Sequence, residues 1–586
     1  MNAETHSTHS INSGQASSGQ SKTCFNCRGV FTIQPEDFQF YNKIGVPPPT
    51  RCPACREQRR LAHRNMDYFL RDCDKCGKKS ISIWHTEIKG YVFYCNECFW
   101  ADDWDGLQYG REFDFSRPFF EQFNELYKQV PKHMSNSMFN TNSDYVVNAR
   151  EDKDCYLGDE MDLSVRSMYG YAVQRCVDCV DCHYINDCEI GYELVKCERC
   201  YACFYCFDSH NCNNSAFLAG CRGVSNSLFC TNLRNVKNHL FNKPVTSEEI
   251  KKMRDKIFSG SHETFQKALK DYQDLRNKSF VKQTIGTNIQ NSTGSFLADS
   301  KNCVNCFSVD NSINCKYCVD IHYSKESMDV NLYECELSYD SLHAGPKGYK
   351  NIFSHMCWYC SDVTYADDCH NSEDLFACAG LKKKKYCIFN RQYDEVSYKE
   401  LKARIIAHME KTGEWGEYFP IELSPHGYNH TFAQEFYPLT EKEVLEKGWR
   451  WLPEINIGEK YKLEKETFIL PDKISETEES VCKEILKCEA TGRFYRIHPQ
   501  EYRFLKKYGL PLPRLSPKER DHRRWEQTKP RKLWNRQCSC DYEIYKNSIV
   551  HKHHPDGRCP NNFEAAYSPD SLAIVYCESC YNREVV

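Results

Sequence analysis

The sequence predicts a multidomain, β-rich protein with zinc-ribbon modules at both ends, which flank a duplicated β-solenoid with a cysteine ladder and helical linkers. Three observations predict this fold class. The 586 residues include 37 cysteines, CxxC pairs lie near both ends, and the cysteines of the middle follow a spacing code that occurs twice. At roughly 150 residues a domain, the length predicts about three or four domains.

Composition and the first residues limit the function classes. The chain lacks an apolar run of about 18 residues, so we expect no membrane partner. Residues 1–22 are rich in Ser, Gln and His and predict a disordered leader, not a signal peptide. We therefore expect a cytoplasmic protein, in which reduced CxxC pairs hold metal. The net charge of −4 argues against a globally basic nucleic-acid binder.

The first module, residues 23–135, carries four CxxC knuckles and predicts two closed zinc sites of four thiolates each. Such sites are structural, because no coordination position remains for a substrate. A helix should follow, with Ser116 as its cap and Pro118 in its first turn. The expected zinc ligands are Cys24, Cys27, Cys52 and Cys55 for one site and Cys73, Cys76, Cys95 and Cys98 for the other.

The middle of the chain is an internal duplication. Copy one covers residues 142–258, copy two covers 290–412, and a helical linker, 259–289, joins them; an offset of 148 superimposes Cys155 on Cys303. Twelve cysteines lie between Cys155 and Cys230, and every gap is a multiple of three, with gaps of nine prominent. We interpret two consecutive nine-residue gaps as one 18-residue coil. Cysteines at the same position of successive coils would then stack in ladders that point inward. A helix cannot keep such a period.

The ladder cysteines allow three interpretations. Cysteine is a small, buriable side chain that fills a narrow interior, which makes a structural ladder the first interpretation. The run Cys197-x2-Cys200-x2-Cys203-x2-Cys206 also suggests zinc or another metal. An iron–sulfur cluster is the third, although the ferredoxin pattern requires a different last spacing and a proline where Phe207 stands.

A connector, 413–479, leads to a degenerate zinc-ribbon module, 480–586. An offset of 464 superimposes Cys24 on Cys488 and Arg56 on Arg520, but the other three ligands of the first site are replaced. The second half keeps cysteines for a third zinc site, with Cys559 or the His551–His554 cluster as possible substitutes. The expected ligands are Cys538, Cys540, Cys577 and Cys580.

The phrases CFNCRGVFTIQPEDFQFYNKIGVPPPTRCPACREQRR, GREFDFSRPFFEQFNELYKQVP and LPLPRLSPKERD resemble a family of cysteine-rich proteins from candidate-phylum bacteria with an N-terminal zinc-ribbon domain. The resemblance covers nearly the whole chain after residue 23. It implies this architecture and zinc, and it implies no reaction. The Cys538-x-Cys540 spacing and the histidine-rich insertion depart from the family pattern.

These features favour a zinc-binding scaffold or interaction protein whose partner is a protein or a nucleic acid. Residues 493–536 hold fourteen Lys or Arg against four acids, interleaved with aromatics. The same basic segment suits docking onto acidic parts of its own chain. Candidate nucleic-acid contacts are Arg514, Arg520, Arg523, Arg524, Arg531, Lys532, Trp525 and Trp534.

Two other functions were weighed. The ladder thiols suit an iron–sulfur electron carrier or a metal-storage protein, which would bind more than three metal ions. An enzyme has the least support, since the sequence contains no GxSxG, HExxH or P-loop motif.

Overall fold

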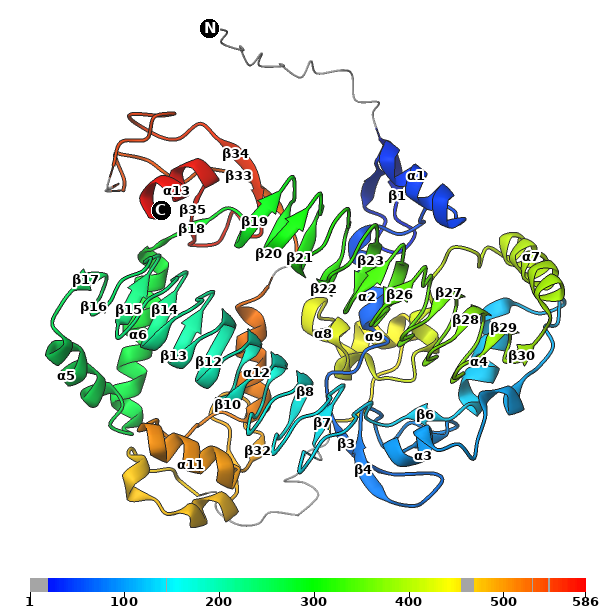
Figure 1. Ribbon diagram of the computed structural model, residues 1–586, viewed down its shortest axis with the longest axis horizontal. Helices are drawn as coiled ribbons and strands as arrows, with labels where there is room; N and C mark the ends of the chain where they lie inside the picture. Colours follow the sequence, from blue (N-terminus) through cyan, green and yellow to red (C-terminus); the bar gives the residue numbers. More distant parts are fainter. Residues whose placement is uncertain are drawn as a thin grey trace, which may run out of the picture.

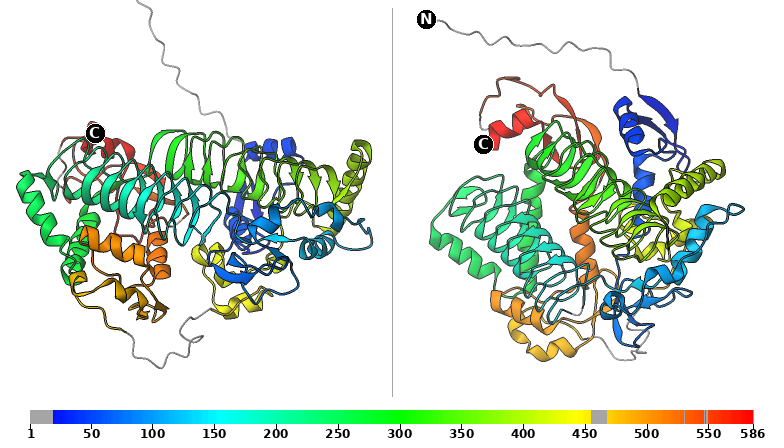
Figure 2. Two further views of the ribbon diagram at one scale, coloured as in Figure 1. Left: turned by 60° about the horizontal axis from the view of Figure 1, so that its bottom comes forward. Right: turned by 45° about the vertical axis from the view of Figure 1, so that its right-hand side comes forward.

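The computed structural model describes residues 19–143, 145–454, 468–529, 531–545, 547 and 549–585. It is multidomain and strand-rich, with cysteine clusters near both ends. Two long stacks of short strands lie side by side, and smaller modules cover their flanks (Figures 1 and 2). Most of the predicted leader lies outside the described residues, but its last residues belong to strand β1 (Gln20–Thr23). No helix of the described part combines the length and the apolar character that crossing a membrane needs.

The first stack, here called ladder one, is a sheet whose strands pair parallel except at its last hairpin. Its strands are β7 (Val146–Val147), β8 (Gly158–Asp162), β9 (Tyr171–Gln174), β10 (Val177–Val180), β11 (His183–Asn186), β12 (Glu189–Glu198), β13 (Tyr201–Phe207), β14 (Asn213–Ala219), β15 (Leu228–Thr231), β16 (His239–Leu240) and β17 (Lys243–Pro244).

The second stack, ladder two, repeats this plan in two six-stranded sheets. Its strands are β19 (Gly286–Gln290), β20 (Gly294–Lys301), β21 (Cys306–Asp310), β22 (Val319–His322), β23 (Met328–Asn331), β24 (Cys335–Glu336), β25 (Tyr339–Leu342), β26 (Gly348–Tyr349), β27 (Ser361–Thr364), β28 (Glu373–Phe376), β29 (Lys385–Ile388) and β30 (Arg391–Gln392).

The parallel strands of ladder one pair at a register of twelve residues. Ladder two has the same register except at β19–β20 and β23–β25, where the offset is eleven, and at β24–β26, where it is thirteen. Cys203 pairs with Ser215, and Val363 pairs with Leu375. Every third residue from 148 to 241 has a positive φ, a conformation that is uncommon for residues other than glycine. Twelve residues therefore contain four three-residue steps, and side chains twelve apart stack. The expected 18-residue coil is wrong: three is the backbone step, but strands pair after twelve residues.

The spacing of nine has a different cause. The Cys188 thiol lies 3.3 Å from the carbonyl oxygen of Asn186, two residues before it, and 3.7 Å from that of Cys197, nine residues after it. Ser164 makes the same two contacts through its hydroxyl group. A gap of nine residues therefore separates an inward side chain from the residue of the next segment whose carbonyl group it contacts. It does not correspond to half a coil.

Helices join and close the ladders. α5 (Ser247–Ile257) and α6 (His262–Lys278) link them, α6 packs on β14 and β15, and α7 (Glu395–Thr412) packs on β29. β18 (Phe280–Lys282) pairs with the C-terminal strand β35. The elements of the N-terminal module are β1, β2 (Val30–Ile33), α1 (Pro35–Ile44), α2 (Pro53–Leu61), β3 (Phe69–Asp72), β4 (Lys79–Ser82), β5 (Phe93–Tyr94), α3 (Asn96–Trp100), η1 (Gly106–Tyr109), α4 (Phe119–Gln129) and β6 (Lys132–His133).

The connector and the C-terminal module follow ladder two. Their elements are η2 (Ile421–Leu423), η3 (Tyr428–His430), α8 (Phe432–Phe436), α9 (Glu441–Glu446), η4 (Ile474–Glu476), η5 (Glu479–Lys483), β31 (Leu486–Lys487), β32 (Phe494–Tyr495), α11 (Pro499–Tyr508), α12 (Pro517–Glu526), β33 (Trp534–Gln537), β34 (Asn562–Ala565), β35 (Ile574–Tyr576) and α13 (Glu578–Val585).

The predicted helix after the N-terminal module is present as α4, but its cap differs. Ser116 lies before the helix and bonds to Asp114. The carboxylate of Glu414, from the connector, accepts hydrogen bonds from the backbone N–H groups of Phe119 and Phe120 at 2.9 and 2.8 Å. A distant acid thus satisfies N–H groups that lack a partner within the helix.

Each end module packs on the ladder that is farther from it in the sequence. The N-terminal module shares one hydrophobic core with ladder two, in which Tyr41 packs near Tyr339. The C-terminal module shares another core with ladder one, in which Leu505 and Tyr192 are buried. In Figure 1, α2 accordingly lies beside the strands of ladder two and α12 beside those of ladder one. Each half of the duplication is therefore completed by the module at the opposite end of the chain.

Candidate metal centres

Three groups of four cysteines can each hold a metal ion, since their sulfur atoms lie within 4.8 Å of one another. A tetrahedron of thiolates with Zn–S bonds of about 2.3 Å places its sulfurs about 3.8 Å apart. The Sγ–Sγ distances of Cys27–Cys52, Cys76–Cys95 and Cys559–Cys577 are 3.8, 3.7 and 3.9 Å. The groups are Cys24, Cys27, Cys52 and Cys55; Cys73, Cys76, Cys95 and Cys98; and Cys538, Cys559, Cys577 and Cys580.

One backbone contact recurs in all three groups. The sulfur of Cys24 accepts the N–H of Cys52 at 3.3 Å, and Cys73 accepts that of Cys95 at 3.3 Å. In the third group, Cys538 accepts the N–H of Cys577 at 3.1 Å. Burial opposes ionisation of Cys73, but such N–H groups outweigh it and lower the pKa of this thiol to about 7. Thiolates are the form that binds metal.

The first two groups contain the eight ligands expected from the sequence, whereas the third differs. Cys559, named as a substitute, occupies the place expected for Cys540. A single residue between Cys538 and Cys540 is too short for the turn of a CxxC knuckle. The Cys540 sulfur instead lies 3.5 Å from Nδ1 of His551 and 3.1 Å from Nδ2 of Asn547.

The first metal group leads directly into an arginine-rich helix. Cys52 is the N-cap residue of α2, and Cys55 lies in its first turn. Arg56 and Arg60, which follow on the same helix, are buried against ladder two. Arg56 lies 2.7 Å from the carboxylate of Asp329, and Arg60 lies 2.6 Å from that of Asp340. We call these contacts the first clasp.

A second clasp repeats this arrangement at the other end of the chain. Arg520 and Arg524 of α12 lie 2.9 and 2.8 Å from the two oxygens of Asp181 in ladder one. Arg520 also contacts Glu501 at 2.6 Å. Burial opposes the charge of Arg520, but the carboxylates of Asp181 and Glu501 outweigh it and raise its pKa well above the ordinary value.

The two clasps correspond at their first arginine and its aspartate, whereas Asp340, the close partner of Arg60, falls on Tyr192. The offset of 464 that superimposes the end modules takes Arg56 to Arg520, and the offset of 148 that superimposes the ladders takes Asp181 to Asp329. Each guanidinium also lies over an equivalent tyrosine ring, with Arg56 5.6 Å from Tyr317 and Arg520 5.0 Å from Tyr169. The C-terminal module has lost three of the four metal cysteines of this site and keeps the clasp, which ladder packing now supports.

The clasps change the interpretation of the basic segment. Arg520, Arg524 and Trp525 are buried, and the largely buried Arg531 side chain pairs with Glu57 and Asp320 at 3.1 and 3.0 Å. The chain's own carboxylates and aromatic rings cover these four side chains, so in this structure they do not offer a free surface to a nucleic acid. The segment docks onto its own chain, which was the alternative interpretation. The candidates that stay at least partly exposed are Arg514, Arg523, Lys532 and Trp534.

The ladder thiols point inward and contact backbone carbonyl oxygens. Cys221 and Cys230 are fully buried, and burial raises their pKa to about 12 and about 11. Where thiols adjoin one another the directions split: contacts with Cys306 and Cys315 lower the pKa of Cys303 to about 3, and the pKa values of Cys306 and Cys315 themselves are raised. Isolated ladder thiols are thus protonated donors, whereas among adjoining thiols only some, such as Cys303, are shifted toward the thiolate.

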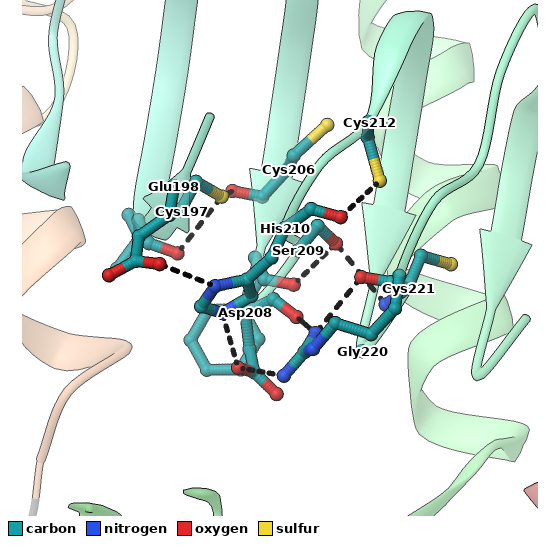
Figure 3. A network of polar contacts seen from close by, with 12 residues as sticks. Cys197, Glu198, Cys206, Asp208, Ser209, His210, Cys212, Gly220 and Cys221 are labelled. Atoms are coloured by element: carbon teal, nitrogen blue, oxygen red, sulfur yellow. Dashed lines mark hydrogen bonds and ion pairs between the residues drawn. The ribbon is translucent and has the colours of Figure 1, made fainter. Parts of the chain in front are cut away.

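A cleft lies between the two ladders and the C-terminal module. A cavity of about 470 Å³ is lined by Arg222 of ladder one, Phe296 of ladder two and Leu572, among others. On its wall, Asp208 accepts from Arg222 at 2.8 Å and lies 3.3 Å from Nε2 of His210 (Figure 3). Burial opposes protonation of His210, but Asp208 and Glu198 outweigh it and raise its pKa.

Sequence reasoning did not identify the clasps, although the chain contained their signal. The offset of 148 superimposes acidic residues of the two ladders, and the offset of 464 superimposes arginines of the two end modules. The sequence does not show that these two sets of residues meet. Comparison with known proteins adds no name to this geometry: no family model matches the chain, and no curated protein is similar to it.

Proposed function

We propose that this chain is a zinc-dependent scaffold protein of the cytoplasm, in which end modules hold two β-solenoids side by side around a binding cleft. The proposal depends on one observation: on helix α2, the cysteines of the first metal group are followed directly by the arginines of the first clasp. Cys55 and Arg56 are neighbours on α2, so a metal at the knuckle fixes the end of the helix that enters ladder two.

We infer that the register of twelve reflects one solenoid coil of four three-residue steps. Parallel pairing at a constant offset of twelve in ladder one, and inward side chains that stack twelve residues apart, support this inference. Solenoids serve commonly as binding surfaces, because repeated coils form long regular faces.

The cleft is the favoured position for a partner. Its volume of about 470 Å³ lies within the range of ligand sites, roughly 300–1,000 Å³. Its walls come from both ladders and the C-terminal module, so its shape depends on the clasps. Binding there would couple partner recognition to an intact metal-supported fold.

Zinc is the metal that best fits the first two groups, since four thiolates in a closed tetrahedron are its usual structural site. Removing zinc from the purified protein with a chelator should expose α2 to protease while much of each ladder stays protected. Cys24→Ser should reproduce this cleavage, and Cys221→Ser, a ladder substitution, should not. An identical cleavage pattern with and without metal would contradict the proposal.

Two other functions have less support. Nucleic-acid binding has lost its buried candidates and would depend on Arg514, Arg523, Lys532 and Trp534. An electron carrier or metal store would use adjoining thiols such as Cys303 and Cys306. An absorption spectrum of protein purified without oxygen separates these cases, because an iron–sulfur cluster absorbs visible light and zinc does not.

A further inference from the structure

The C-terminal module contains more metal donors than one ion can use. A tetrahedral site takes four ligands, which Cys538, Cys559, Cys577 and Cys580 supply. Three further donors, Cys540, His551 and His554, are buried beside them with exposed fractions of 0, 0 and 5%. The insertion that carries the histidines has no counterpart in the N-terminal module.

These extra donors converge on one point. His551 Nδ1 lies 3.5 Å from the Cys540 sulfur and 3.2 Å from Nε2 of His554. The same Nε2 lies 3.2 Å from the Cys580 sulfur, which already belongs to the four-cysteine group. Cys540, His551, His554 and Cys580 thus form a second set of four donor atoms, all within 4.8 Å of one another.

The second nitrogen of His551 supports a ligand role. Nε2 lies 2.9 Å from the carboxylate of Glu584 on α13, whose side chain is 5% exposed. A carboxylate that accepts the far N–H of a histidine fixes its ring and leaves the near nitrogen free to bind metal, which is the usual arrangement around metal-bound histidines. Asn547 also donates to the Cys540 sulfur at 3.1 Å, as expected around a thiolate.

We propose that the C-terminal module binds two zinc ions, which share the Cys580 thiolate as a bridge. Cys538, Cys559 and Cys577 complete the first coordination sphere, and Cys540, His551 and His554 complete the second. Five thiolates and two neutral imidazoles give the two divalent ions a net charge of −1. His553, the neighbouring histidine, is exposed, and its Nε2 lies 3.5 Å from the Cys559 sulfur and 3.3 Å from the Cys580 sulfur. It is therefore an alternative imidazole donor beside the shared thiolate, and the buried Cys540, His551 and His554 are the ligands of the proposed second ion.

The proposal rests on the metal-dependent scaffold function and adds a fourth ion to its three four-cysteine sites. Native mass spectrometry of the full-length protein, produced with zinc, counts the ions directly. We expect one fewer ion in Cys540→Ala and His551→Asn than in the wild type and two fewer in Cys580→Ala. The control His239→Asn, on β16 of ladder one, should leave the count unchanged. These differences hold even if ladder thiols bind additional metal.

X-ray absorption at the zinc edge of the wild-type protein gives a second test that requires no variant. Scattering from imidazole should appear, because among these sites only the second sphere includes histidine. A wild-type count of three ions with sulfur ligands alone would overturn the bridged pair and leave the scaffold proposal intact. Unchanged counts in Cys540→Ala and His551→Asn would overturn it as well, and a wild type without zinc would overturn both proposals.

Discussion

Asp181 should be among the least replaceable acidic residues of ladder one, because two buried arginines depend on its charge. Its side chain is fully buried, and its oxygens lie 2.9 and 2.8 Å from Arg520 and Arg524. Asp181→Ala leaves both guanidinium groups buried with weaker compensation. Breaking a buried pair by removing one partner costs about 3–5 kcal/mol, since an uncompensated charge remains in a low-dielectric environment.

Asp187 provides a matched control in the same ladder. It pairs with Arg175 at 2.6 Å, but the two side chains are 45 and 50% exposed. Asp187→Ala should therefore change the free energy of unfolding by only about 0.2–1 kcal/mol. Asp181→Asn should lie between the two alanine variants, because the amide keeps an acceptor and loses the charge.

Urea denaturation followed by tryptophan fluorescence measures these differences, and Trp525, buried on α12, reports on the clasp itself. The midpoint of the first transition should fall markedly for Asp181→Ala and hardly for Asp187→Ala. Equal midpoints for the two variants would refute the reasoning, because they would show that α12 docks without its ion pairs.

Three further predictions follow from single contacts. Cys221→Ser should cost on the order of 1 kcal/mol and leave the metal count unchanged, since serine hydroxyls make the same ladder contacts elsewhere; a lost metal ion would contradict this. His210 has a pKa above its ordinary value of about 6.5, so its stabilisation is complete below that pH and disappears as the pH rises through the folded pKa; the stability difference from His210→Gln, measured from pH 6 to pH 9, should shrink accordingly. Glu414→Ala removes the acceptor for Phe119 and Phe120 and should cost about 0.5–2 kcal/mol in thermal or urea unfolding, whereas an unchanged stability would exclude a capping role.

Some of the architecture could be predicted because it depends on local spacing. Eight cysteines in CxxC knuckles identified the first two metal groups, since the knuckle turn alone determines where its sulfurs point. The step of three residues was also visible, because cysteine recurs at inward positions at multiples of three, among larger side chains such as Ile185 and Leu194. The coil length could not be predicted from the spacing. A gap of nine residues separates a thiol from the carbonyl group that it contacts, and it does not measure the length of a coil.

The rest depended on contacts between distant segments. The third metal group could not be predicted in full, because its ligand Cys559 lies in an insertion of irregular length. Only the fold shows that this insertion brings Cys559 to within 3.9 Å of Cys577. Arg520 and Arg524 look like a solvent-exposed basic face in the sequence. Only the fold shows that Asp181 meets them, because nothing in the chain order says which ladder each end module covers.

The packing of each end module on the more distant ladder has a consequence for synthesis on the ribosome. Arg60 hydrogen-bonds Asn331, a residue 271 positions later in the chain. At about 5–20 residues per second, the N-terminal module waits roughly 14 to 54 s before its docking surface has been translated. During that interval its clasp arginines lack the carboxylates of ladder two, and the module has only its own contacts and its two four-cysteine groups, which could hold metal. If these groups bind zinc as proposed, zinc supply at the moment of translation would then decide whether the nascent N-terminus waits folded or becomes a substrate for chaperones and proteases.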